Sequence, residues 1–229
     1  MMNNKQKPSF SQTSQSGFTI IESLVAIMVV SILLISIAPV IVLSAATRLQ
    51  AKRIERASEA ARGYINSVQA DALLDPPISD ATQINAVPAP TVGALSCPGD
   101  DYCTAPAAPA ANYNLYCFDN DGGGCNSMMD MVVQAFGYNP TATDPDNNIN
   151  ALKGYELGIR VYRADGFSET ALVTQAQRGS RQVAATGGLG DRQSPLVEMT
   201  TVITPGKPTS ENIRDRICGG PCPTPSPSP

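Results

Sequence analysis

The chain has 229 residues, with 16 lysines and arginines against 20 aspartates and glutamates, and it contains no histidine. This length allows about one medium domain plus an anchor, and a formal net charge of −4 offers no basic field for nucleic acid. The absence of histidine excludes Ser-His-Asp and Cys-His catalysis and all histidine-ligated metal sites.

The N-terminal part combines a polar start with a long apolar segment. Residues 1–17 include Lys5 and Lys7 but no acid, and the stretch from Ser23 to Ala46 holds 24 residues without a charge. As a helix it would measure about 36 Å, enough to cross a hydrocarbon core of about 30 Å. The apolar part of a secretory signal, the alternative, is only about 7–15 residues long. A plain membrane anchor explains the length but not the carboxylate of Glu22.

The stretch GFTIIE, residues 17–22, resembles the type III signal of type IV pilins and pseudopilins. In that family Gly17 would be the last leader residue, Phe18 the first mature residue and Glu22 the fifth. The resemblance implies cleavage after Gly17 by a prepilin peptidase and N-methylation of Phe18. It also implies that Glu22 meets the amine of a neighbouring subunit, which fits the cost of a lone carboxylate in lipid.

The apolar helix has further features that bear on this resemblance. Pro39 stands at mature position 22, where pilins often carry proline, and its missing N–H predicts a kink or a melted turn. Ser31 and Ser36 can donate to helix carbonyls, so they are compatible with a membrane span. Four cations follow the span: Arg48, Lys52, Arg53 and Arg56. Counting positive charges would place them in the cytoplasm, whereas the processing motif favours an exported head.

Beyond the span the sequence predicts that the helix continues and becomes amphipathic. Pro76 and Pro77 stop it, so we expect a cleaved leader over 1–17 and a helix over 18–75, with the membrane span at about 18–46. Apolar residues at steps of three or four predict a stripe that packs on a globular head. The stripe comprises Ile54, Ala57, Ala61, Tyr64 or Ile65, Val68 and Ala72.

Residues 76–215 are expected to form a pilin-like head. Its Pro- and Ala-rich start, 76–115, predicts a long irregular connection. Residues 127–139 suggest a short helix with Ser127 as its cap and Gly137 as its stop. Alternating β-formers predict three strands, of which the second is the weakest: 155–163, 171–177 and 195–204.

Alternation in the last of these strands also predicts which side faces the core. The core-facing residues would be Val197, Met199, Thr201 and Ile203. Residues 216–229 predict a Pro-rich flexible tail. The fold class is therefore α+β, with a long N-terminal transmembrane helix, kinked near Pro39, packed on a small antiparallel sheet as in pilins.

Six cysteines lie in three locally spaced pairs: Cys97 and Cys103, Cys117 and Cys125, Cys218 and Cys222. In an exported head they predict structural disulfides, but six cysteines allow 15 pairings and the sequence does not choose among them. A zinc site is the alternative, and it lacks both histidine and a C-x2-C pair.

The loop CFDNDGGGC raises the question of calcium. Asp119 and Asp121 are closely spaced oxygen donors beside glycines, which makes them a candidate calcium site, with a plain turn as the alternative. A second acidic loop occurs at 143–148. No other cofactor is expected.

Residues 26–65 resemble cyanobacterial pseudopilins linked to polysaccharide secretion and gliding. The resemblance implies a structural, non-enzymatic minor pilin or pseudopilin in the inner membrane, single-pass, with its head in the periplasm. Its partners would be prepilin peptidase, other pilins or pseudopilins and an inner-membrane assembly platform, but no nucleic acid. A membrane-anchored adhesin or glycan-binding protein is the alternative, with Tyr113, Tyr116 and Tyr138 as candidate contacts.

Overall fold

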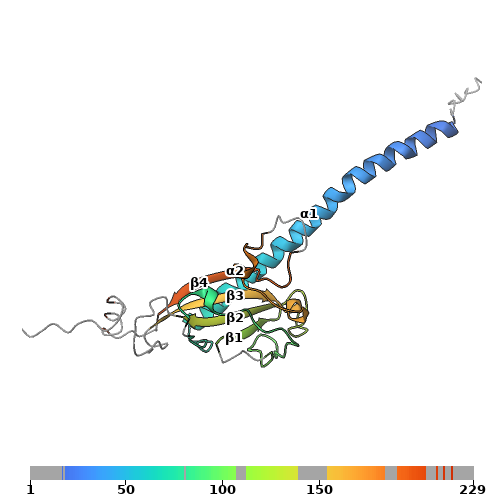
Figure 1. Ribbon diagram of the computed structural model, residues 1–229. Coiled ribbons are helices and arrows are strands. Elements are labelled where there is room, and N and C mark those ends of the chain that lie inside the picture. The colour runs from blue at the N-terminus through green and yellow to red at the C-terminus, as the bar shows by residue number, and fades with distance from the viewer. Residues whose placement is uncertain are drawn as a thin grey trace, which may run out of the picture. The chain divides into compact units, whose positions relative to one another are not determined.

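The computed structural model describes residues 17, 19–79, 81–106, 112–138, 154–183 and 190–204, together with Ser210, Arg214 and Cys218. The chain divides into two compact units, Met1–Ser44 and Ala45–Pro229. The long helix α1 (Ile20–Gln69) contributes its first part to the first unit and the rest to the second. The four strands found among these described residues all belong to the second unit, which is called the head below (Figure 1).

In the first unit α1 passes through Pro39 with helical residues on both sides. The predicted melted turn is therefore wrong, because the loss of one N–H donor does not stop the neighbouring residues from staying helical. The kink stays a prediction. The two serines behave as expected: Ser31 Oγ donates to the carbonyl of Ile27 at 2.7 Å, and Ser36 Oγ donates to that of Leu33 at 2.8 Å.

In the head, α1 packs one face on the sheet. Its buried residues are Gln50, Arg53, Ala57, Ala60, Ala61, Tyr64 and Val68. The spacing from Ala57 to Val68 confirms most of the predicted stripe. Ala72 is exposed instead, because α1 ends at Gln69 and Asp71 takes a left-handed φ of 54° that turns the chain away. The burial of Gln50 and Arg53 was not predicted.

The sheet has four antiparallel strands in the order β1-β2-β3-β4. They are β1 (Asn114–Phe118), β2 (Met131–Tyr138), β3 (Tyr155–Arg163) and β4 (Val197–Ile203). A long N-terminal helix packed on an antiparallel sheet is the predicted pilin-like α+β class, which is confirmed.

The predicted short helix at 127–139 is wrong, since Met131–Tyr138 forms the central strand β2. Every residue of β2 is buried. Val133 belongs to the core cluster on the α1 face, whereas Val132 and Phe136 belong to the cluster on the opposite face. A strand covered on both faces shows an unbroken apolar run, and such a run does not reveal whether its period is that of a strand or a helix.

The weaker strand predicted at 171–177 is also wrong. The chain there is irregular and ends in a one-turn helix, α2 (Gln175–Arg178). Thr174 and Gln177 form a capping box, in which the Gln177 N–H donates to Thr174 Oγ1 and the Thr174 N–H donates to Gln177 Oε1. The spacing Thr-x-x-Gln is a helix-start signal that outweighs four alternating residues.

The other two predicted strands are confirmed as β3 and β4. Ile203 is buried in the core cluster that includes α1, and Val197 and Met199 pack against that cluster. The predicted core-facing side of β4 is therefore correct for its apolar members.

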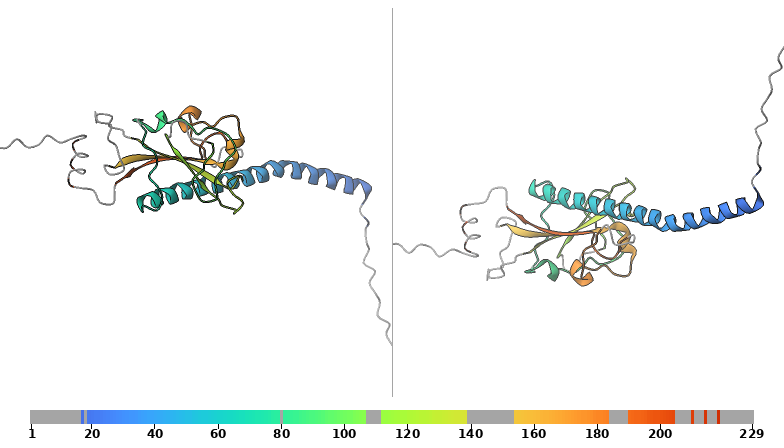
Figure 2. Two further views of the ribbon diagram at one scale, coloured as in Figure 1. Left: turned by 90° about the horizontal axis from the view of Figure 1, so that it is seen from below. Right: turned by 90° about the horizontal axis from the view of Figure 1, so that it is seen from above.

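Irregular chain covers the face of the sheet opposite α1 (Figure 2). This layer contains the short helices η1 (Ile84–Ala86) and η3 (Ala164–Ser168). Its core cluster includes Val87, Tyr113, Phe136, Tyr162 and Phe167. Because this layer covers them, the polar side chains of Gln134 in β2 and Arg160 in β3 are buried although they point away from α1.

Gly158 of β3 is required by this packing. A Cβ at Gly158 would lie 2.4 Å from Cε2 and 2.7 Å from Cζ of Phe136, the residue paired with it in register. We expect Gly158→Ala to lower the free energy of unfolding by about 1–3 kcal/mol through overpacking. Thermal or chemical denaturation of the detergent-solubilised chain measures the loss.

Gly63→Ala is the matched control for this prediction. Gly63 lies within α1, and its added Cβ would meet Phe118 at 3.5 Å, an ordinary contact. Replacing a helical glycine by alanine should leave stability unchanged or raise it by about 0.5–1 kcal/mol. Equal losses in the two variants would contradict the steric explanation.

Candidate assembly site

The start of α1 places Glu22 in the first helical turn. Its N–H donates to Thr19 Oγ1 at 3.3 Å and to the Thr19 carbonyl at 3.1 Å. Thr19 thus caps the helix, a role that the Thr-x-x-Glu spacing signals but that was not predicted. A carboxylate in the first turn is also favoured by the helix dipole. Local capping is therefore one reason for an acid at this position, alongside pairing with a neighbour.

The predicted cleavage position is open at Gly17. Gly17 is exposed, and beyond its two chain neighbours no residue has an atom within 4 Å of the place that a Cβ would take there. Phe18, the predicted new N-terminus, lies outside the described residues.

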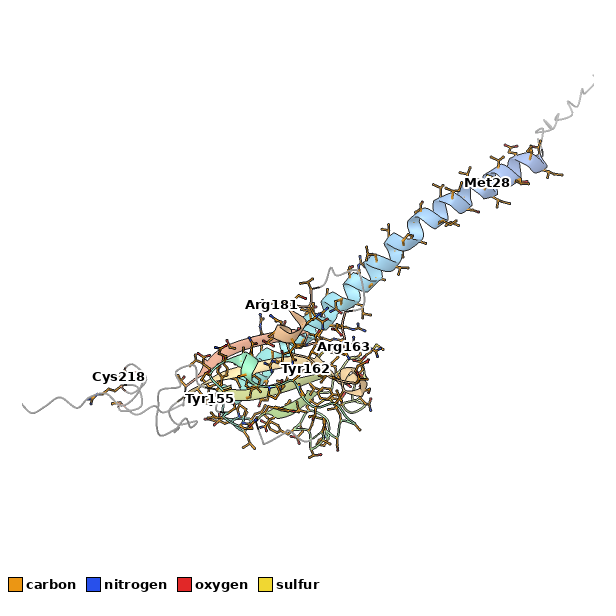
Figure 3. The ribbon with its side chains drawn as sticks, in the orientation of Figure 1. Met28, Tyr155, Tyr162, Arg163, Arg181 and Cys218 are labelled. Atoms are coloured by element: carbon orange, nitrogen blue, oxygen red, sulfur yellow. A yellow bond between two sulfur atoms is a disulfide. The ribbon has the colours of Figure 1, made fainter. Side chains whose placement is uncertain are left out.

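The first part of α1 presents an apolar surface on all sides. The exposed fractions of its large hydrophobic residues range from 87% at Ile20 to 48% at Leu43. The side chains around Met28 point outward from the helix (Figure 3). One helix, α1, is long and apolar enough to cross a membrane among the described residues, with a window of mean hydropathy 3.0 that is not buried. A core helix of a water-soluble protein would bury such a window. The one charged residue of α1 before Arg48 is Glu22.

These features coincide with a known sequence motif. Residues 12–38 match the prokaryotic N-terminal methylation motif, and the match covers Gly17, Glu22 and most of the apolar part of α1. In this segment the chain is similar to type IV pilins. No curated protein and no solved structure matches the chain.

The motif carries several general consequences. It implies processing by a prepilin peptidase, N-methylation and assembly into a filament, and with the apolar helix it indicates a prepilin anchored in the inner membrane. Proteins of this type are structural rather than enzymatic, as predicted for this chain. The match ends within α1 and leaves the head to be interpreted from its own residues.

Two of the four cations after the span belong to the packing of the head. Arg53 is only 5% exposed, and its Nη2 lies 3.8 Å from Sδ of Met128. Arg56 Nη1 donates to Sδ of Met129 at 3.2 Å. Burial lowers the pKa of Arg53, and the charge of Arg163 lowers it further. Counting all four cations as free juxtamembrane charges therefore overstates the argument for a cytoplasmic head.

Four of the described cysteines form two local disulfides. Cys97 is bonded to Cys103 and Cys117 to Cys125, which excludes most of the 15 connectivities that the sequence left open. Cys218 is also disulfide-bonded, and Cys222 lies outside the described residues. Disulfides are typical of an oxidising compartment.

In the candidate calcium loop, backbone N–H groups of the loop itself already donate to the carboxylates. Oxygens of Asp119, Asp121 and Asp130 lie within 4.8 Å of one another, and Asp130 was not predicted. Asp119 accepts N–H groups of Gly124 at 2.8 Å and Gly122 at 2.7 Å, and these bonds lower its pKa. Such bonds account for the convergence of the carboxylates without an ion, so calcium here stays a prediction. Residues 143–148 lie outside the described residues.

The candidate glycan-contacting tyrosines are core residues. Tyr113, Tyr116 and Tyr138 are 1%, 8% and 4% exposed. Burial, followed by a hydrogen bond with Glu156, raises the pKa of Tyr138 to about 12. Their rings have no free face for stacking on a sugar, so the adhesin hypothesis loses the residues proposed for it.

Proposed function

We propose that the chain is a minor pilin or pseudopilin whose α1 inserts into the inner membrane and then into a filament. The observation that carries the proposal is the single carboxylate of Glu22 at the start of an exposed apolar helix that bears the methylation motif. After cleavage at Gly17, the Phe18 amine and Glu22 would be the only charged groups at this end of α1.

The proposed mechanism is a charge pairing in lipid. Glu22 of one subunit accepts the Phe18 amine of its neighbour, while the apolar surfaces of the two helices pack together. A carboxylate alone in lipid is costly, so this pair favours one partner and one register over others. Prepilin peptidase, other pilins or pseudopilins and an inner-membrane assembly platform with its own ATPase are the partners that this mechanism needs.

The proposed topology is a single span with the head in the periplasm. The disulfides of the head support this orientation. A head with much irregular chain supports a minor rather than a bulk subunit. A role in polysaccharide secretion and gliding rests on the resemblance of residues 26–65 alone.

Processing tests the proposed function directly. In cells with active prepilin peptidase, the intact mass should show loss of residues 1–17 and gain of one methyl group on Phe18. Gly17→Asp should block the cut, because the exposed, uncrowded glycine position would then carry a charged side chain. Peptidase-deficient cells provide the control. A protein that still begins at Met1 or Met2 in peptidase-active cells would refute the proposal.

A further inference from the structure

The two described disulfides of the head lie against each other. Sγ of Cys97 is within 4.8 Å of Sγ of both Cys117 and Cys125. Cys103, the partner of Cys97, is not part of this group. Of the first disulfide, the sulfur of Cys97 is therefore the one that lies near both sulfurs of the second.

Backbone pairing holds this arrangement in place. The segment around Cys103 runs along the edge of β1, where the Cys103 N–H donates to the Leu115 carbonyl at 2.8 Å. In return, the Cys117 N–H donates to the Asp101 carbonyl at 2.9 Å. These two bonds fix the segment around Cys103 on β1. Beside Cys97, the Thr104 N–H donates to the Ser96 carbonyl at 2.8 Å and the Ser96 N–H donates to the Ala105 carbonyl at 3.1 Å, so backbone bonds hold the chain next to Cys97 on the same segment independently of the disulfide.

The two disulfides differ in their access to solvent. Cys117 is fully buried and Cys125 is 5% exposed. Cys97 and Cys103 are both partly exposed. Because exchange rates depend on access to the sulfur, an external thiol should reach the Cys97–Cys103 bond first.

We propose that Cys97 is an exchange site through which the buried Cys117–Cys125 disulfide is opened and re-formed. A dithiol first reduces the Cys97–Cys103 bond: the dithiol is oxidised to a disulfide, and Cys97 and Cys103 become thiols. The Cys97 thiolate then attacks Sγ of Cys117 or Cys125. A bond from Cys97 to the attacked sulfur forms, the Cys117–Cys125 bond breaks, and the other sulfur leaves as a thiolate, so the second step involves no net oxidation.

This chemistry would let a dithiol oxidoreductase correct the buried pairing without entering the core. The class of this reagent rests on the proposed export of the head, whereas the exchange step depends only on the position of the sulfurs. A failure of the exchange test therefore leaves the proposed pilin function untouched, and a failure of leader cleavage leaves the exchange step untouched.

Two single variants test which sulfur is the exchange site. In a background of Cys218→Ser and Cys222→Ser, Cys103→Ser leaves a thiol at Cys97, and Cys97→Ser leaves one at Cys103. Both variants lack the same disulfide, so loss of that crosslink affects them equally. Non-reducing peptide mapping at mildly alkaline pH should find bonds from Cys97 to Cys117 or Cys125 at least about tenfold more often than bonds from Cys103, because a thiol held within 4.8 Å of both sulfurs acts at high effective concentration. Equal rearrangement, or none in Cys103→Ser, would overturn the proposal.

Reduction kinetics test the same step in the unmodified cluster. With dithiothreitol as the probe and alkylation as the readout, Cys117–Cys125 should open at least about tenfold more slowly in Cys97→Ser/Cys103→Ser than in the parent chain. Limited proteolysis checks that the head of the double variant remains folded. Equal or faster opening of Cys117–Cys125 in the double variant would show that Cys97 is not the route to the buried bond.

Discussion

Glu22→Gln should leave the chain inserted and its head folded, but should lower its recovery with other pilins by a factor of about one hundred or more. Removing one partner of a poorly solvated ion pair leaves the other charge unpaired, at a cost of about 3–5 kcal/mol, and each 1.4 kcal/mol is about a factor of ten in binding. Crosslinking and co-purification with the neighbouring pilins measure incorporation, and proteolysis of the head measures folding.

Two controls separate charge pairing from helix capping. Glutamine can replace glutamate in a capping box, so Glu22→Gln removes the charge and keeps the local capping geometry. Thr19→Ala does the opposite: it removes the Oγ1 that accepts the Glu22 N–H and should cost about 1 kcal/mol of local helix stability. Normal incorporation of Glu22→Gln, with loss in Thr19→Ala, would mean that Glu22 serves the helix start rather than the partner.

The sequence predicts well where a single physical requirement decides the outcome. To predict the apolar helix, the length and hydropathy of the segment suffice. To predict the buried stripe from Ala57 to Val68, the helical period suffices. Strands β3 and β4 were predictable because every second residue of 155–161 and of 197–203 is apolar or β-branched, and the apolar ones face the core on the α1 side. The capping of α1 by Thr19 and of α2 by Thr174 was also accessible, since both follow a Thr-x-x-Glu/Gln spacing.

The sequence predicts poorly where irregular chain supplies the burial. In β3 the alternation places Gly158, Arg160 and Tyr162 on one side, which would ordinarily face water. Residues 81–106 and η3 cover that side. Their sequence has no helical or strand periodicity from which a second layer could be predicted. The same covering layer buried both faces of β2, whose residues are mostly apolar on either side, and so concealed its strand period.

This second layer buries the side chain of Arg160 completely. Its Nε lies 2.9 Å from Oε2 of Glu198, the residue opposite it in β4. Its Nη1 donates to the Val87 carbonyl at 2.8 Å, and its guanidinium lies 5.2 Å from the ring centroid of Phe136. One side chain thus joins two strands to the covering segment 81–106.

Arg160→Met should therefore destabilise the head by about 3–5 kcal/mol, because it leaves the carboxylate of Glu198 and the Val87 carbonyl buried without their donor. At about 2–4 °C per kcal/mol for a chain of this size, the melting temperature should fall by roughly 10 °C. Thermal denaturation of the detergent-solubilised full chain measures the shift. Arg192→Met is the matched control, since Arg192 pairs with Glu169 while its side chain is 55% exposed, and it should cost at most about 1 kcal/mol.

The double variant Arg160→Met/Glu198→Leu shows how the network divides its contribution. Removing both charges abolishes the unpaired carboxylate, and a buried ion pair can often be replaced by apolar residues without loss. The carbonyl of Val87 would still lack its donor, and an unsatisfied buried acceptor costs about 1–3 kcal/mol. We therefore expect the double variant to recover only part of the lost stability. Full recovery would show that the ion pair is dispensable and that the carbonyl finds another donor. No recovery would show that the bonds to the covering segment, rather than the pair with Glu198, are what Arg160 contributes to the head.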